Sequence, residues 1–294
     1  MENKNSALGM AAAFAANLIF GFSFIFSKLA LKAADPLIIL SVRFTFSFLF
    51  LNILLALRLI KVDFSGKPIK KLILMSFAQP LLYFIFELYG MKFVSSALSG
   101  VIISLVPVGV VCFSALFLNE KPTIRQYICA AVSLVGVCLV SILNNNGNKN
   151  SVLGVVLLFA AVVCAVAFNL LSRNQSKTFS AIERTYFMFF VAFIGFNLIA
   201  LTVLNKNYKA EMVRAFSSAD FIIGVLYLSI ISSVAAFILY NYSTTKITAI
   251  RSSSFSNIIT VVSVLAGTVF LSEMSPYELL LCVPIILGVY GVNR

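Results

Sequence analysis

The sequence lacks several residue types on which common protein chemistries depend. It contains no histidine and no tryptophan, and only 10 of its 294 residues are acidic. Without histidine, the chain has neither a histidine general base nor a histidine metal ligand. It also contains no G-x-x-x-x-G-K-[ST] segment, which is the signature of an ATP-binding P-loop. These absences argue against an enzyme and against an ATP-driven pump formed by this chain alone.

The cysteines do not form a recognisable metal or disulfide pattern. All five lie within apolar stretches and none belongs to a C-x-x-C pair: Cys112, Cys129, Cys138, Cys164 and Cys282. Cysteines in such surroundings pack as small apolar side chains. We therefore expect no disulfide, no metal site and no bound cofactor.

Charge is also scarce. Charged residues make up 11% of the chain, whereas soluble domains carry about 25%. Hydrophobic residues make up 61%, and the mean hydropathy is +1.04. The net charge of +12 does not indicate a nucleic-acid partner, because the basic residues lie between apolar stretches rather than on one face. The composition predicts a membrane protein.

Ten apolar stretches are each close to the length of about 20 residues that spans a bilayer as a helix. They are residues 8–27, 37–57, 72–91, 95–118, 126–143, 152–171, 185–204, 220–240, 247–271 and 277–292. We interpret the first as a retained helix rather than a signal peptide, because its length suits a full span and its leading segment carries only Lys4. The sequence therefore predicts an all-α polytopic membrane protein with ten transmembrane helices.

The basic residues predict the orientation of these helices. If the N-terminus is cytoplasmic, 14 of the 22 Lys and Arg residues fall in cytoplasmic segments and 7 on the opposite side. An excess of Lys and Arg marks the cytoplasmic loops. We expect a multi-pass protein of the cytoplasmic membrane with both termini in the cytoplasm.

The second half of the chain resembles the first. LGMAAAFAA at 8–16 matches LGVVLLFAA at 153–161, and FSALFLNE at 113–120 matches AGTVFLSE at 266–273. Apolar strings also align by chance, but these matches include polar residues and favour a true repeat. We divide the chain into a first unit at 1–143, a linker at 144–151 and a second unit at 152–294. A repeated unit of five spans enters the membrane inverted the second time, as in secondary transporters.

These residues resemble the EamA-type members of the drug/metabolite transporter superfamily. The resemblance covers nearly the whole chain and rests on FLNE (117–120) with Pro122, FLSE (270–273) with Pro276, Pro107 and Arg43. The second half departs from the pattern, because Thr260 stands opposite Pro107 and Met188 opposite Arg43. The resemblance implies ten helices as a 5+5 inverted repeat around a central cavity. It also implies that the first, third, fourth, sixth, eighth and ninth helices line the cavity, and that small organic metabolites are moved, often outward.

Two charged residues lie clearly inside predicted spans, and such charges are functional candidates. Arg43 and Glu87 are expected at similar depths in adjacent helices. One alternative is a structural ion pair. The other is a functional pair, in which Arg43 binds a substrate carboxylate or phosphate or Glu87 carries a coupling proton.

Polar residues share one face of the third predicted span. Ser76, Gln79, Tyr83 and Glu87 follow helical spacing. A long polar face is costly in lipid, so it faces either the cavity or hydrogen-bonding neighbours.

The remaining cavity candidates come from other spans: Asn17, Pro107, Asn169, Tyr227, Asn257 and Thr260. Close helix packing is the competing interpretation for the small polar residues of 247–271, and a packing kink for Pro107. Tyr240 is assigned to the aromatic belt at the membrane interface.

The sequence as a whole predicts a secondary transporter, not an enzyme. We expect it to move a small polar organic metabolite, an amino acid or a related compound, by alternating access, as export or exchange. The partners we expect are this solute and the lipid bilayer, with proton coupling as one option, and the protein acts as a monomer or homodimer without nucleic acid. The alternatives are a lipid flippase and an integral-membrane enzyme that modifies lipids.

Overall fold

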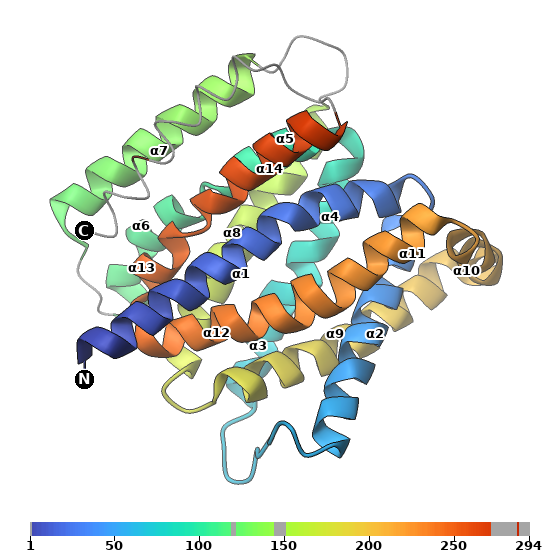
Figure 1. Cartoon of the computed structure of the whole chain (residues 1–294), viewed down its shortest axis with the longest axis horizontal. Coiled ribbons are helices and arrows are strands. Elements are labelled where there is room, and N and C mark those ends of the chain that lie inside the picture. The colour runs from blue at the N-terminus through green and yellow to red at the C-terminus, as the bar shows by residue number, and fades with distance from the viewer. Residues whose placement is uncertain (1, 119–121, 144–150, 272–286, 288–294) are drawn as a thin grey trace.

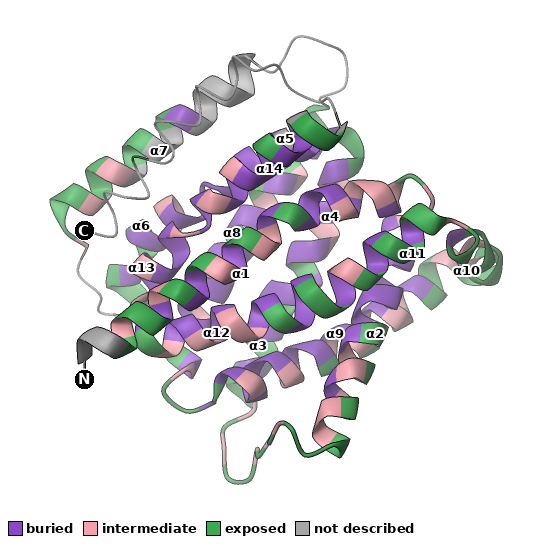
Figure 2. Ribbon diagram, viewed as in Figure 1, coloured by how far each residue is buried: buried purple, intermediate pink, exposed green. Residues whose placement is uncertain are grey.

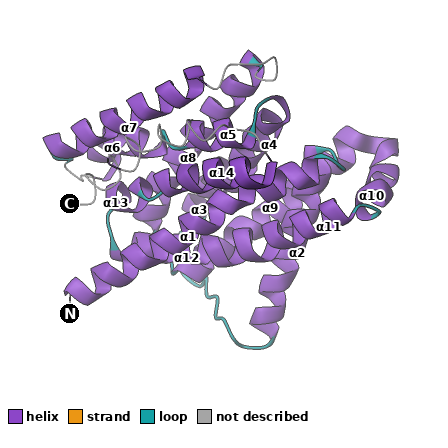
Figure 3. Cartoon of the chain, turned by 45° about the horizontal axis from the view of Figure 1, so that its top comes forward, coloured by secondary structure: helices purple, strands orange, loops and turns teal. Residues whose placement is uncertain are grey.

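A computed structural model describes residues 2–118, 122–143, 151–271 and 287, and every element in this part of the chain is helical (Figures 1 and 3). The elements of the first half are α1 (Glu2–Leu31), α2 (Pro36–Ala56), α3 (Lys70–Ser76), η1 (Phe77–Leu82), α4 (Tyr83–Phe93), α5 (Ser96–Ile103), α6 (Val106–Leu118) and α7 (Ile124–Leu143). Those of the second half are α8 (Val152–Gln175), α9 (Ala181–Leu204), η2 (Asn205–Asn207), α10 (Tyr208–Phe216), α11 (Ala219–Leu226), η3 (Tyr227–Ala235), α12 (Ala236–Lys246), α13 (Ala249–Ser254) and α14 (Asn257–Leu271).

Eight helical segments of the described chain are long and apolar enough to cross a membrane. They are Asn5–Leu31, Pro36–Ala56, Lys70–Phe93, Leu98–Leu118, Val152–Gln175, Ala181–Phe216, Ala219–Lys246 and Ala249–Gly267. In addition, α7 covers the predicted stretch 126–143. The tenth predicted stretch, 277–292, and most of the predicted linker lie outside the described residues, so the ten-helix arrangement stays a prediction.

The outer faces of these helices carry large apolar side chains. Phe14, Ile53, Val163 and Leu198 are all exposed, and Figure 2 shows exposed residues along the outside of several helices. In water such surfaces are unfavourable, whereas lipid solvates them as well as a protein interior does. The burial pattern therefore fits a bilayer.

Several predicted spans are interrupted rather than continuous. The third is broken by η1, a π-helical turn in which Gln79 has an extended backbone (φ −148°, ψ 125°) and Pro80 supplies no N–H. The fourth is broken between α5 and α6, just before Pro107. Apolar periodicity does not reveal such breaks, because both sides of a break remain apolar.

Element boundaries recur between the halves at the two spacings that separate the matching sequence segments. The first is 145 residues, as between 8–16 and 153–161, and the second is 153 residues, as between 113–120 and 266–273. α2 begins after its N-cap Asp35 and α9 after Ser180, 145 residues later. α5 begins after Ser95 and α13 after Thr248, 153 residues later. The segments η1 and η3 also overlap at the second spacing, and the breaks before α6 and α14 fall within two residues of it. The first four spans of each half therefore follow one plan.

Helices of the first half pack against helices of the second half. α1 lies against α12 and α14, its counterpart α8 lies against α4 and α6, and α2 packs on α9. The approach is close at two corresponding glycines. A Cβ on Gly9 would lie 2.7 Å from that of Lys246, and one on Gly154 would lie 2.8 Å from that of Phe93. Both distances are too short for a residue that carries a Cβ atom. The close approach of α1 to α12 and of α8 to α4 therefore requires glycine at these two positions.

Polar contacts identify the helix ends that meet at one end of the molecule. Lys67, in the loop between α2 and α3, binds Glu183 at the start of α9 with 2.7 Å between Nζ and Oε1. Arg173, near the end of α8, donates to the carbonyl oxygen of Thr244 near the end of α12 at 2.7 Å. Because the first turns of α1 also lie here, with Gly9 against Lys246, we call this the N-terminal end.

The opposite end is held in a corresponding way. Lys28, 145 residues before Arg173, donates to the carbonyl oxygens of Met91 and Val94 at the end of α4, at 2.6 and 2.5 Å. The amide of Ser151, just before α8, donates to the carbonyl of Phe93 at 3.2 Å. The short helix α10 also lies here, and we call this the α10 end.

Candidate functional site

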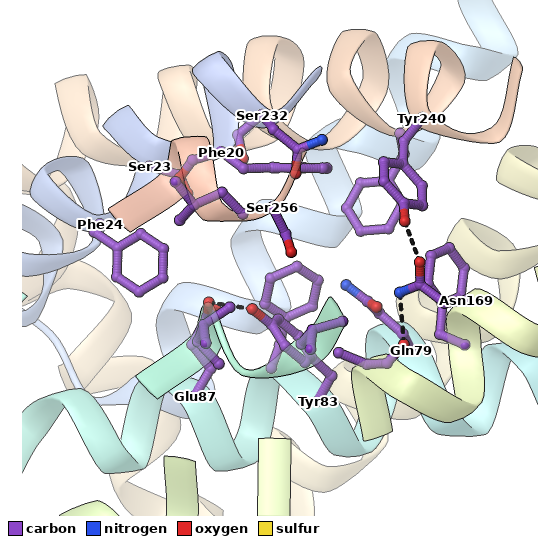
Figure 4. Close-up of a pocket in the computed structure, with 18 of the residues that line it drawn as sticks. Phe20, Ser23, Phe24, Gln79, Tyr83, Glu87, Asn169, Ser232, Tyr240 and Ser256 are labelled. Carbon is purple, nitrogen blue, oxygen red and sulfur yellow. Dashed lines mark hydrogen bonds between the residues drawn. The ribbon is translucent and has the colours of Figure 1, made fainter. Parts of the chain in front are cut away.

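A cavity of about 60 Å³ lies in the middle of the helix bundle, between the two halves. Its lining comes from α1, α2, η1, α4, α8, η3 and α12 and from residues beside the breaks before α6 and α14. Its polar lining residues are Asn17, Ser23, Arg43, Gln79, Tyr83, Glu87, Asn169, Ser232, Tyr240 and Ser256 (Figure 4). Each is at most 9% exposed.

Arg43 and Glu87 both line this cavity but bond to different partners. The Arg43 guanidinium donates to the hydroxyl of Ser233 at 2.9 Å and to that of Ser232 at 3.3 Å. It also lies 4.2 Å from the ring centre of Phe84, a cation–π contact. Glu87 accepts a hydrogen bond from the Tyr83 hydroxyl at 2.7 Å. The alternative of a direct Arg43–Glu87 ion pair is therefore wrong.

Three of the four residues in the polar stripe reach the cavity. Tyr83 and Glu87 lie one turn apart on α4, and Figure 4 shows them joined on one side of the cavity. Gln79 lies in η1, where the helix is broken. Ser76 does not line the cavity, and its hydroxyl bonds to the carbonyl of Leu72 one turn earlier at 2.8 Å.

Two buried carboxamides face the cavity from corresponding helices. Asn17 in α1 and Asn169 in α8 each donate to a carbonyl four residues earlier, at 2.7 and 2.8 Å. Asn169 also accepts a hydrogen bond from the Tyr240 hydroxyl. This bond joins α8 to α12 at one side of the cavity (Figure 4). Both residues lie near the helix ends that meet at the N-terminal end.

Aromatic rings form much of the remaining wall. Phe237 packs edge-on against Phe20 at 5.2 Å and against Phe168 at 6.0 Å between ring centroids, and Phe84 lies 6.1 Å away. Such rings offer flat apolar surface and attract cations through their faces. The cavity thus combines two charged side chains that form no direct ion pair with an aromatic wall.

Four of the ten predicted site residues lie outside the cavity lining. Pro107 is buried in the first turn of α6, and its neighbour Val106 faces the cavity instead. The hydroxyl of Tyr227 donates to the carbonyl of Ile19 at 3.0 Å, which ties η3 to α1.

The other two misplaced residues belong to α14. Thr260 donates to the carbonyl of Gly100 at 3.0 Å and so joins α14 to α5. Asn257 is buried beside Ser256, which lines the cavity. Close packing, the competing interpretation of the small polar residues, therefore describes Thr260.

Tyr240 was wrongly placed in the aromatic belt. It is 5% exposed and lines the cavity, because α12 extends to Lys246 and leaves Tyr240 well inside the span. The repeat could have predicted this position, because Tyr240 corresponds to the cavity candidate Glu87 at the spacing of 153. Ser232 corresponds in the same way to Gln79.

Arg184 lies one residue before the predicted span 185–204, but the structure places it within a helix. α9 begins at Ala181, and Arg184 is fully buried in its first turn. Its guanidinium donates to the carbonyl and hydroxyl of Ser172, both at 2.7 Å, and to the carbonyl of Asn241 at 2.5 Å. It therefore joins α8, α9 and α12 near the N-terminal end.

The described lining of the cavity contains one acidic and one basic side chain, Glu87 and Arg43. Among the described residues that line it, Glu87 is the one carboxylate. The described chain also contains no group of three His, Cys, Asp or Glu residues placed to hold a metal ion. Hydrolytic sites usually pair an acid with a base or use a metal.

Comparisons with known proteins agree with this description. The model of the EamA-like transporter family matches residues 7–142 and again 152–294. The uncharacterized transporter YcxC of Bacillus subtilis (strain 168) is 30% identical over 288 residues, covering 96% of this chain and 91% of that protein. Protein PagO of Salmonella typhimurium is 25% identical over 289 residues, covering 93% and 89%.

A solved crystal structure has the same fold, with a TM-score of 0.73 over 96% of this chain and 95% of its own at 19% identity. The family match covers almost the entire chain, and YcxC is named as an uncharacterized transporter. The protein is therefore a multi-pass membrane transporter, and it belongs to the EamA-like transporter family.

Proposed function

We propose that this transporter carries a small polar metabolite with both a carboxylate and an ammonium group, an amino acid or a close relative. The observation that carries the proposal is the separation of charges on the cavity wall. Arg43 is bonded to neutral hydroxyls and Glu87 to a neutral phenol. Because neither charge neutralises the other by direct pairing, a solute with two opposite charges complements both.

The side-chain chemistry assigns a role to each part of the wall. A guanidinium binds carboxylates through paired N–H donors, which favours Arg43 as the carboxylate site. Glu87, with the Tyr83 hydroxyl beside it, suits an ammonium group. The amides of Asn17 and Gln79 add neutral donors and acceptors, and the surrounding rings accept the apolar part of the solute.

Transport requires the cavity to change size. A volume of about 60 Å³ holds a few water molecules, whereas ligand sites usually measure roughly 300–1,000 Å³. We propose alternating access, in which the helices move at the corresponding breaks in η1 and η3 and before α6 and α14. Broken helices at matching positions of two repeats are typical of secondary transporters.

We also propose the membrane, the orientation and the direction of transport. The excess of basic residues at the N-terminal end favours a cytoplasmic location for that end, with the protein in the cytoplasmic membrane. Export or exchange is the direction we propose, with Glu87 as the group for any proton coupling. The double family match supports two inverted units, 1–143 and 152–294, joined by the linker 144–151.

The proposal is tested by counterflow into vesicles that contain the purified protein. We expect labelled amino acids to accumulate against an internal pool, and both amino acid esters and decarboxylated amines to compete poorly. Arg43→Gln should raise the KM for the carboxylated solute about ten- to hundredfold, because a charge-assisted contact is lost. Arg214→Gln is the matched control, since Arg214 is exposed and outside the cavity.

Two results would contradict the proposal. Esters that compete as well as the parent amino acids would show that no carboxylate is recognised. Flipping of a fluorescent phospholipid without movement of any soluble metabolite would favour the flippase alternative. Elution of each variant at the wild-type volume on size-exclusion chromatography shows that it has folded.

A further inference from the structure

A second hollow opens at the N-terminal end, separate from the central cavity. It measures about 590 Å³, and its polar lining consists of Asn5, Ser6, Arg173, Lys246, Thr248 and Arg251. These residues come from the start of α1, the end of α8, the end of α12 and the start of α13. We call this hollow the basic vestibule.

The vestibule gathers positive charge from three helices. Arg173, Lys246 and Arg251 line it, and no described residue of the lining is acidic. The fold holds the three together, because Gly9 lets α1 approach the end of α12 and Arg173 donates to Thr244 there. Three basic side chains from different helices thus border one hollow, a lining that suits an anion.

The corresponding region at the α10 end is different. Arg173 corresponds to Lys28 at the spacing of 145, but Lys246 and Arg251 correspond to Phe93 and Leu98 at the spacing of 153. The hollow at that end mixes basic residues with two carboxylates, Asp35 and Glu211. The cluster of three basic groups is therefore not a consequence of the repeat. It belongs to one end only.

The vestibule lies close to the central cavity. Arg173 follows the cavity residue Asn169 by four residues, about 6 Å along α8, and Lys246 follows Tyr240 by six, about 9 Å along α12. The hydrogen bond between Asn169 and Tyr240 stands between the two spaces. An anion in the vestibule would therefore lie one or two helical turns from the cavity.

We propose that the basic vestibule is a binding site for a phosphate-type oxyanion. Three cationic groups match a group that carries up to two negative charges and three acceptor oxygens. The hydroxyls of Ser6 and Thr248 add neutral donors. The oxyanion belongs either to the headgroup of an anionic phospholipid at the membrane surface or to a phosphorylated solute in water. This inference does not depend on the substrate proposed for the cavity.

The test measures binding to the purified, folded transporter by two probes. One arm titrates inorganic phosphate at constant ionic strength and follows thermal unfolding in a non-ionic detergent. The other uses native mass spectrometry after incubation with vesicles of phosphatidylglycerol in phosphatidylcholine. The double variant Lys246→Gln/Arg251→Gln removes two charges but spares Arg173, whose bond to Thr244 supports the fold. The matched control, Lys32→Gln/Lys92→Gln, removes two charges from the hollow at the α10 end.

We expect the wild type and the control to bind one or both probes, and the vestibule variant to bind about tenfold or more weakly. Binding of phosphatidylglycerol alone would identify a lipid headgroup as the source, and binding of inorganic phosphate would identify a soluble oxyanion. The proposal is overturned if neither probe binds, or if the vestibule variant and the control lose affinity equally. Counterflow of amino acids by the vestibule variant keeps this test separate from that of the proposed substrate.

Discussion

Two arginines of this protein are almost completely buried, and their partners assign them different roles. Arg184 donates to backbone carbonyls of α8 and α12, which are fixed acceptors that do not rearrange. Arg43 donates to serine hydroxyls, which can rotate, and it borders the cavity. Removing Arg184 would remove the hydrogen bonds that join α9 to α8 and α12, so we assign it to stability. Arg43 can exchange its hydroxyl partners for a solute.

Glu87 allows a direct test of proton coupling at the scale of one residue. A carboxylate that binds and releases a proton in each cycle makes transport respond to a pH gradient, whereas glutamine cannot do so. We expect Glu87→Gln to abolish the stimulation of vesicle uptake by a pH gradient while exchange at equal pH persists. The surface change Glu211→Gln is the control. A variant that still responds to the gradient would remove Glu87 from the coupling mechanism.

At the scale of elements, α2 and α9 are joined by two related hydrogen bonds. The Ser41 hydroxyl donates to Asn197 at 2.7 Å, and the Tyr186 hydroxyl donates to Asn52 at 3.0 Å. Asn52 corresponds to Asn197, and Ser41 to Tyr186, at the spacing of 145. Asn197 makes one bond more between the helices, to the Thr45 hydroxyl at 2.9 Å. The repeat thus includes hydrogen bonds between side chains, but Asn197 makes two bonds to the other helix and Asn52 makes one.

This inequality predicts an order of stabilities. Hydrogen bonds between membrane helices contribute on average about 0.6 kcal/mol and at most about 1.7 kcal/mol each. Asn197→Leu, which loses two such bonds, should therefore destabilise the protein by roughly 1–2 kcal/mol, and Asn52→Leu by about half as much. Thermal unfolding in detergent measures the difference, with Thr202→Val as a control that alters bonds within α9 only. A larger loss for Asn52→Leu would contradict this account.

The sequence predicted the helices better than it predicted their breaks. Length and hydropathy located the spans because lipid requires long apolar helices. Residues 77–82 and 104–105 do not interrupt the apolar stretches, so hydropathy did not locate η1 or the break before α6. Pro80 and Pro107 were the local signals, and only Pro107 was interpreted as a kink. Those breaks decide which side chains face inward. Asn17, Gln79 and Glu87 therefore reached the cavity as expected, whereas Pro107 and Thr260 did not.

The charge on the cavity wall was predictable for a different reason. Burying an ionised side chain in a membrane is costly, so Arg43 and Glu87 stood out from their apolar spans. Ser232, Tyr240 and Ser256 did not stand out, because small hydroxyl residues and tyrosines are common in membrane helices. Their cavity positions follow from the tertiary packing of η3, α12 and α14. Whether any of these residues binds the solute stays a prediction.

At the scale of the whole molecule, the two ends differ although the halves share one plan. The loop between α2 and α3 is tied to Glu183 at the N-terminal end, and its counterpart between α9 and α11 forms α10 at the opposite end. If the halves are inverted copies, these two loops face different compartments. The basic vestibule then opens to one compartment alone, which is the cytoplasm in the orientation proposed above. A solute leaving the cavity would meet strong positive charge on one side and mixed charge on the other.

Inversion predicts where two exposed serines react. Ser65 lies in the first of these loops and Ser217 in the second. In a variant with all five cysteines replaced by alanine, we expect a membrane-impermeant maleimide to label Ser217→Cys in intact cells, and Ser65→Cys only after lysis. Labelling of both from one side would refute the inverted arrangement and, with it, alternating access by exchange of two equivalent halves. The reverse labelling would keep the inversion but place the N-terminal end outside, so the basic vestibule would then face the external medium.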